Sequence, residues 1–161
     1  MVINFNQLHQ GKRNPDGRLG GILIEAKNGQ LYRDLYGIEI AETILQTLRK
    51  YGIDTIDKAK TICPVYLHSF DFQSIIYWSE HSELPRNYLL FEIEPFKLEQ
   101  VNKYANGIGF EDYIIWDYAR KTPNPVLEKA KDLGLLVHVW TFKDEKPIFN
   151  ATTNIVFISY I

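Results

Sequence analysis

Short apolar runs that alternate with helical segments are the feature that most constrains the fold of this chain. Each run is rich in branched or aromatic residues, and the runs occupy residues 21–26, 64–67, 87–91, 112–115 and 135–142, with residues 156–161 as a candidate sixth. Continuous apolar runs of this length are typical of strands that are covered on both faces. Because the connections are long enough for crossovers, the pattern predicts an α/β protein with parallel strands.

The expected helices lie between these runs, and the best delimited one covers residues 125–133. Asn124 can cap its free N–H groups, Pro125 suits its first turn, and Gly134 permits a left-handed exit. Further helices are expected at residues 37–51, 71–78 and 96–105, the first ended by Gly52 and the second capped by Asp71.

Two architectures satisfy this order of elements. An open doubly wound sheet fits 161 residues, whereas a closed (β/α) barrel typically needs about 250 residues. Length alone therefore favours the open sheet. No internal repeat or linker divides the sequence, so a single domain is expected over residues 1–161.

Charge and composition narrow the choice of partner. Eighteen Lys and Arg residues against twenty Asp and Glu give a formal net charge of −2, which offers no electrostatic reason to expect a nucleic-acid partner. The single cysteine, Cys63, cannot form an internal disulfide and is expected in the core. No signal peptide and no membrane span are visible in the sequence, and nothing in it indicates a compartment.

Two charged residues mark the end of the first predicted strand. Side chains alternate along a strand, so Glu25 and Lys27 emerge on the same side. In a parallel α/β protein, ligands bind at the carboxyl ends of the strands. Glu25 could ligate a hard divalent cation and Lys27 could attract a phosphate. An ion pair at a strand terminus is the simpler interpretation of the two residues considered by themselves.

Other polar residues near strand ends have competing interpretations. His68 and Ser69 follow the second predicted strand, but no Gly-x-Ser-x-Gly turn surrounds Ser69, so a hydrogen-bonding role is expected for it. Trp140 offers a flat wall for a substrate or a cation, although a core position is commoner for tryptophan. The sequence contains no phosphate-binding glycine loop and no zinc-ligand motif.

Several ordered segments together resemble the glycerophosphodiester phosphodiesterase family. Residues 21–28 resemble its strand carrying Glu-x-Lys, residues 64–71 its following strand, and residues 134–142 its penultimate strand. The turn at residues 106–109 falls where the family often has a similar one, and the resemblance spans roughly residues 20–145. It implies a (β/α) barrel that hydrolyses glycerophosphodiesters to glycerol 3-phosphate and an alcohol. This implication outweighs the length argument for an open sheet.

The resemblance implies roles for three residues. Glu25 corresponds to a glutamate that ligates magnesium or calcium, Lys27 to a lysine near the phosphate, and Trp140 to an aromatic residue that borders the substrate pocket. The sequence lacks the family's His-Arg-Gly, its Glu-x-Asp and the following His-Asp pair. The catalytic residues therefore stay unassigned, and the metal is not expected to bind firmly to this chain alone.

Two functional hypotheses follow from this partial match. In the first, residues 1–161 are a single truncated domain, an incomplete TIM-type barrel with parallel strands, from a phosphoric diester hydrolase that acts on glycerophosphodiesters. In the second, the chain is a non-catalytic interaction or structural subunit derived from that family. Either form would expose barrel edges, so a protein partner or self-association is expected to cover them.

Overall fold

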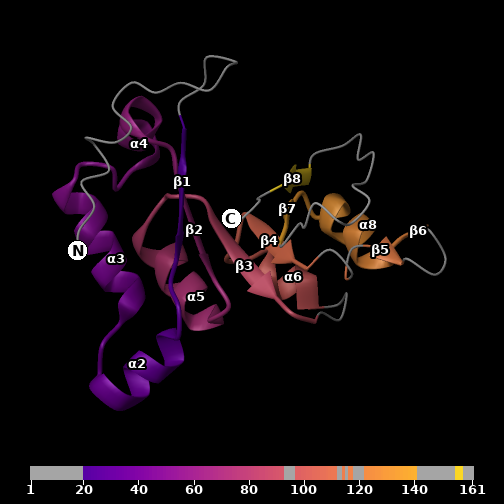
Figure 1. Cartoon of the computed structure of the whole chain (residues 1–161), viewed down its shortest axis with the longest axis horizontal. Helices are drawn as coiled ribbons and strands as arrows, with labels where there is room; N and C mark the ends of the chain where they lie inside the picture. The colour runs from indigo at the N-terminus through magenta and orange to yellow at the C-terminus, as the bar shows by residue number, and fades with distance from the viewer. Residues whose placement is uncertain are drawn as a thin grey trace.

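The computed structural model describes residues 20–92, 97–111, 114, 116–117, 122–140 and 155–157. Within these ranges strands and helices are interspersed along the chain (Figure 1). The strands are β1 (Ile22–Glu25), β2 (Val65–Ser69), β3 (Arg86–Leu90), β4 (Gly107–Phe110), β5 (Trp116–Asp117), β6 (Thr122–Pro123), β7 (Leu136–Val139) and β8 (Ile155–Phe157). The helices are α2 (Gly29–Tyr36), α3 (Ile40–Lys50), α4 (Ile56–Ile62), α5 (Phe72–His81), α6 (Leu98–Val101) and α8 (Pro125–Asp132).

The strands of the main sheet lie side by side in chain order. Strands β1, β2, β3, β4 and β7 are neighbours in that sequence, β8 pairs with β7, and every one of these pairings is parallel. A doubly wound sheet instead reverses the direction of strand addition at a switch point. The observed order is therefore consistent with a partial β/α barrel. Strands β5 and β6 form a separate antiparallel pair.

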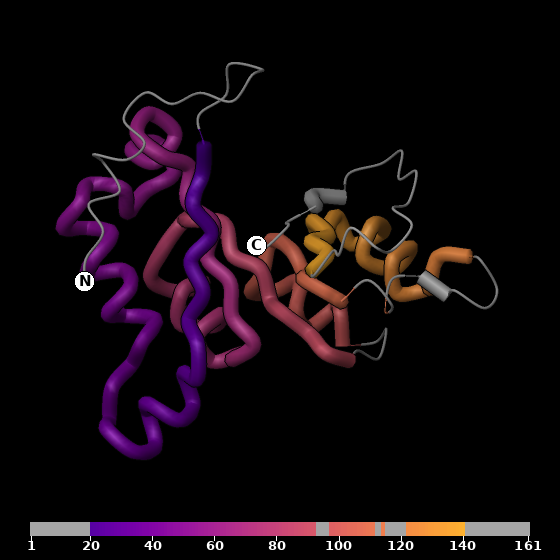
Figure 2. Tube along the Cα trace, viewed as in Figure 1, coloured from indigo at the N-terminus to yellow at the C-terminus, as the bar shows by residue number. Residues whose placement is uncertain are grey.

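Helices pack against one side of this sheet. Helix α5 contacts β2 and β3, and α8 contacts β7. Trp78 of α5 is fully buried, and its indole Nε1 donates a hydrogen bond of 3.0 Å to the backbone oxygen of Ala41 in α3. Figure 2 shows the chain from α2 through α3 at the β1 end of the sheet and α8 at the opposite end. The apolar core therefore lies between the sheet and these helices.

Two helix caps predicted from the sequence are confirmed. The Asp71 side chain accepts a hydrogen bond of 3.2 Å from the backbone N–H of Ser74 at the start of α5. Asn124 accepts one of 3.0 Å from the backbone N–H of Val126 at the start of α8. Gly134 follows α8 with a φ of 71°, the left-handed exit expected for glycine.

The structure describes only one residue of the strand predicted at residues 112–115. That residue, Ile114, is helical, and residues 112, 113 and 115 lie outside the described ranges. The strands on either side are β4, which ends at Phe110, and β5, which begins at Trp116. The resemblance suggested a turn at residues 106–109, yet Gly107 and Gly109 lie within β4. Neighbouring side chains fill the space beside both positions, so neither position has room for a side chain. A Cβ atom on Gly107 would overlap the Asn87 side chain, and one on Gly109 would overlap Leu89.

Other element boundaries also differ from the predictions. Helices α2 and α4 were not predicted, and the helix expected over residues 37–51 begins only at Ile40, because Gly37 (φ of 63°) ends α2. The helix expected over residues 96–105 is the single turn α6. Residues 141–142 and 158–161 of the last two predicted strands lie outside the described ranges.

The crowding at β4 gives a prediction. Gly107→Ala is expected to lower the free energy of unfolding by about 2 kcal/mol, because the added methyl group would press on Asn87 and on the backbone of Leu136. Urea denaturation measures the effect. Gly20→Ala is the matched control, since nothing lies within 4 Å of the added atom there. Equal stability of the two variants would contradict the packing argument.

Candidate functional site

Glu25 and Lys27 meet at the carboxyl end of β1. The Lys27 Nζ lies 2.7 Å from Glu25 Oε2, and the lysine side chain is 72% exposed while the glutamate is 19% exposed. An ion pair with one partner so exposed contributes little to stability. The ammonium group can therefore exchange this carboxylate for another anion at small cost, as binding of a phosphate would require.

Three further polar residues lie on the same side of the sheet as Glu25. Paired residues of parallel strands point to the same face, and the register joins Glu25 to His68 and His68 to Asn87. His138 reaches this face through β4, because Asn87 pairs with Gly107 while His138 pairs with Gly109, two residues further along. We call the side that carries Glu25, His68, Asn87 and His138 the polar face.

Asn87 and His138 are in contact across β4. The Asn87 amide nitrogen lies 3.1 Å from each imidazole nitrogen of His138, although a whole strand separates their backbones. The contact is possible because Gly107 and Gly109 place no side chain between them. Asn87 is fully buried, and its Oδ1 has no hydrogen-bond partner among the described residues. Sequence reasoning missed this contact because only the sheet register brings the two residues together.

Both histidines of the polar face have depressed pKa values. Burial lowers the pKa of His68 to about 4, with Glu25 opposing the shift and Lys27 adding to it. Burial also lowers the pKa of His138 to about 4, and His68 contributes to that shift. Both rings are therefore neutral near pH 7 and are weak proton acceptors.

Trp140 belongs to an aromatic cluster at the carboxyl end of β7. Its ring meets Phe70, which follows β2, edge to face at a centroid distance of 5.4 Å, and Phe91, which follows β3, at 5.6 Å. Phe70 and Phe91 stack on each other at 4.4 Å. The indole Nε1 of Trp140 is buried and has no hydrogen-bond partner in the described part of the chain. Trp140 is thus packed against two aromatic rings, and its indole N–H is a buried donor without a partner among the described residues.

The three residues singled out by the resemblance share one edge of the sheet but come from strands far apart in it. Glu25 ends β1 and Lys27 follows it, whereas Trp140 follows β7, with β2, β3 and β4 between them. The structure therefore brings Glu25 and Lys27 into direct contact and places Trp140 with the aromatic residues that follow β2 and β3.

The described residues do not fit a complete metal site. In these ranges no group of three or more His, Cys, Asp or Glu side chains is arranged to hold a metal ion. Glu25 supplies one carboxylate, which is already paired with Lys27. Magnesium and calcium need six or more oxygen ligands, so one carboxylate is insufficient.

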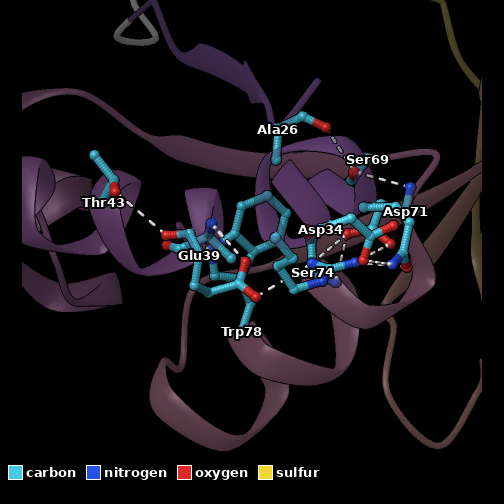
Figure 3. A network of polar contacts seen from close by, with 11 residues as sticks. Ala26, Asp34, Glu39, Thr43, Ser69, Asp71, Ser74 and Trp78 are labelled. Atoms are coloured by element: carbon cyan, nitrogen blue, oxygen red, sulfur yellow. Dashed lines mark hydrogen bonds and ion pairs between the residues drawn. The ribbon is translucent and has the colours of Figure 1, made fainter. Parts of the chain in front are cut away.

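Ser69 has the hydrogen-bonding role predicted for it. Its hydroxyl group donates to the backbone oxygen of Ala26 at 2.7 Å and accepts from the backbone N–H of Asp71 at 3.0 Å (Figure 3). The residue is fully buried. Its hydroxyl group is therefore committed to joining the turns after β1 and β2, and a nucleophilic role is not supported.

A separate hollow lies among the helices. It has a volume of about 380 Å³ and is lined by residues of α3 and α5 and of the segments that follow each of them, Leu45, Arg49, Asp54, Thr55, Ser79, Glu80, His81, Ser82 and Glu83. None of the polar-face residues lines it. The carboxyl edge of the sheet therefore remains the candidate site.

Comparison with known proteins gives two distant relatives. The chain is 23% identical to glycerophosphodiester phosphodiesterase GDPD6 of Arabidopsis thaliana, over 85% of this chain and 43% of the relative. It is also 23% identical to glycerophosphodiester phosphodiesterase GDPDL3 of the same plant, over 79% of this chain and 17% of that relative. No family model and no solved structure matches. The chain thus bears a distant family-level resemblance to these phosphodiesterases and spans less than half the length of either.

No helix in the described ranges has both the length and the apolar character needed to cross a membrane.

The buried histidines predict how stability depends on pH. The unfolded chain binds protons near the ordinary histidine pKa of 6.5, whereas the folded chain binds them only near 4. Stability should therefore be greatest above pH 6.5 and fall steadily towards pH 4, by on the order of 3 kcal/mol for each histidine.

Urea denaturation at a series of pH values measures this loss. His138→Gln should reduce the slope, because it removes one of the two histidines whose pKa burial lowers. Identical slopes in wild type and His138→Gln would contradict the assignment of the loss to the polar face.

Proposed function

We propose that this chain is part of a (β/α) barrel of the glycerophosphodiester phosphodiesterase type and supplies a phosphate-binding portion of its site. The observation that carries the proposal is the Glu25–Lys27 pair, 2.7 Å apart at the carboxyl end of β1. The sequential order of parallel strands and the distant similarity to two such phosphodiesterases support it. We treat residues 1–161 as one domain of incomplete TIM type.

In this proposal, the exposed Lys27 ammonium binds a phosphate oxygen of a glycerophosphodiester. Lys27 is 72% exposed and forms a weak pair with Glu25, so the incoming anion competes with that carboxylate. The resemblance makes Trp140 a residue that borders the substrate pocket, at the β7 end of the same edge. The resemblance makes Glu25 a ligand of magnesium or calcium, but further ligands would have to come from elsewhere, and no step is derived through the metal.

Hydrolysis of a phosphodiester needs proton transfer on both sides of the phosphorus. His68 and His138 do not suit that task, because both are buried and their pKa values lie at about 4. The sequence contains no His-Arg-Gly, Glu-x-Asp or His-Asp segment of the family type. We therefore propose that the acid and base come from residues outside this sequence, in a longer polypeptide or a partner.

The alternative is a non-catalytic interaction or structural subunit. Two observations favour it: β1 has a single neighbour in the described sheet, and α2 with the following turn exposes a cluster of apolar side chains, Leu31, Tyr32, Leu35, Tyr36 and Ile38. Exposed strand edges and apolar patches are typical of surfaces that a partner covers.

Phosphate binding tests the proposal. Wild type is expected to bind glycerol 3-phosphate, and Lys27→Gln should weaken the binding about tenfold because one charge-assisted hydrogen bond is lost. Isothermal titration calorimetry or NMR titration gives the dissociation constants. Lys58→Gln is the matched control, since Lys58 is 55% exposed and pairs with Asp54 at 2.8 Å. Equal affinities in wild type and Lys27→Gln would overturn the assignment.

Catalysis gives a second prediction. Purified chain 1–161 should not hydrolyse glycerophosphocholine in the presence of magnesium or calcium, because no acid and base pair is assigned in it. A chain extended upstream with the missing family segments should hydrolyse it. Turnover by the 161-residue chain alone would contradict the proposal that the acid and base lie outside this sequence. Failure of the extended chain would favour the non-catalytic alternative.

A further inference from the structure

A network of polar side chains joins the turn after β1 to the turn after β2. The Arg33 guanidinium of α2 makes two contacts of 2.8 Å with the Asp71 carboxylate, Nη1 with Oδ2 and Nη2 with Oδ1. A third contact of 3.2 Å joins Arg33 to Glu39. Such two-point pairing of arginine with a carboxylate fixes geometry as well as distance. The network therefore holds α2 in one position against the start of α5.

The carboxylate of Asp71 is charged in this network. Burial alone would raise its pKa, but hydrogen bonds from Arg33 and Ser74 outweigh burial and the pKa is lowered. The Arg33 and Asp71 side chains are 21% and 13% exposed, so water screens their attraction less than that of a surface pair. This pair is thus better placed to hold structure than the exposed pair of Glu25 and Lys27.

Lys27 lies in the turn between β1 and α2, and the network fixes the start of this turn at Ala26. Ala26 donates its backbone N–H to the backbone oxygen of His68 at 3.0 Å. Its own backbone oxygen accepts a hydrogen bond of 2.7 Å from the Ser69 hydroxyl, which in turn accepts from the backbone N–H of Asp71 (Figure 3). The residue immediately before Lys27 is therefore fixed to β2.

The same network anchors the other end of the turn. Gly29 lies directly against Asp71, and a Cβ atom there would overlap the carboxylate and lie 2.8 Å from the Ser74 hydroxyl oxygen. Asn28 has a φ of 55°, in the left-handed region, and links this glycine to Lys27. The backbone of Lys27 therefore lies between two residues that are held in place, Ala26 and Gly29.

We propose that Arg33, Ser69 and Asp71 are positioning residues for Lys27. The network they form with the backbone of Ala26 and Gly29 directs the Lys27 side chain to the carboxyl edge of the sheet, beside Glu25. The ion pair with Glu25 is too exposed to set that direction by itself. The inference rests on the proposed function, since it is the phosphate-binding role of Lys27 that the network serves. Arg33 lies six residues after Lys27 and Asp71 lies on another strand's turn, so neither belongs to the Glu-x-Lys segment itself.

Two variants separate this role from the capping of α5. Asp71→Asn keeps a side chain that caps helices well but removes the charge that pairs with Arg33. Arg33→Lys keeps the positive charge but loses the two-point contact. The matched controls are Asp54→Asn, which breaks the exposed pair with Lys58, and Arg49→Lys, which changes an exposed arginine of α3.

The experiment combines three measurements on the full 161-residue chain. NMR order parameters of the Lys27 and Asn28 amides report local rigidity, titration with inorganic phosphate reports affinity, and thermal unfolding reports overall stability. Wild type should show order parameters of about 0.85, and Asp71→Asn and Arg33→Lys should lower them towards about 0.6. Both variants should bind phosphate about tenfold more weakly. Their melting temperatures should fall only somewhat further than those of the two controls, so that both stay folded at the temperature of the titration.

The outcomes decide the two proposals separately. Unchanged order parameters in both variants, or a loosened turn with unchanged phosphate affinity, would overturn the positioning role. A fall in melting temperature well beyond the controls, with weaker binding but a rigid turn, would also overturn it and leave a general structural role. Wild type and Lys27→Gln that bind phosphate equally well would instead refute the proposed function, and the order parameters would still show whether the network holds the turn.

Discussion

Parallel pairing in chain order is the constraint on which the rest of this structure depends. Because the strands are parallel, the carboxyl ends of β1, β2, β3, β4 and β7 form one continuous edge, and the chain order places them along it in sequence. Every residue discussed as functional lies on or next to that edge. Helices cover the opposite face of the sheet with apolar side chains, so the alternation along each strand leaves the polar residues together on the other side.

Two glycines make room for the contact between Asn87 and His138 on the polar face. Gly107 and Gly109 of β4 have no side chains, so Asn87 and His138 can meet across this strand. Desolvation of the histidines follows from the same close packing and removes them from proton transfer near neutral pH. The two histidines therefore take no part in the chemistry proposed for this chain, which rests on Glu25, Lys27 and Trp140.

Much of this fold could be predicted from patterns of neighbouring residues. The contacts between residues far apart in the sequence could not. The apolar runs that became β1, β2, β3 and β7 and the caps at Asp71 and Asn124 are signals carried by neighbouring residues. β4 was missed because its glycines are explained only by Asn87 and Leu89 on the adjoining strand. The pairing of Glu25 with Lys27 followed from strand alternation. The contacts of Arg33 with Asp71 and of Asn87 with His138 could not be predicted from local patterns, since they join residues 38 and 51 positions apart.

The two unlike edges of the described sheet limit how copies of this chain could associate through strands. A second copy that continued the parallel pattern on β1, with its polar face on the same side, would have to present its β8 edge. That contact joins unlike surfaces head to tail and leaves a fresh β1 edge on each copy added. Assembly by this route would stop only when a ring closes and would otherwise grow into a filament.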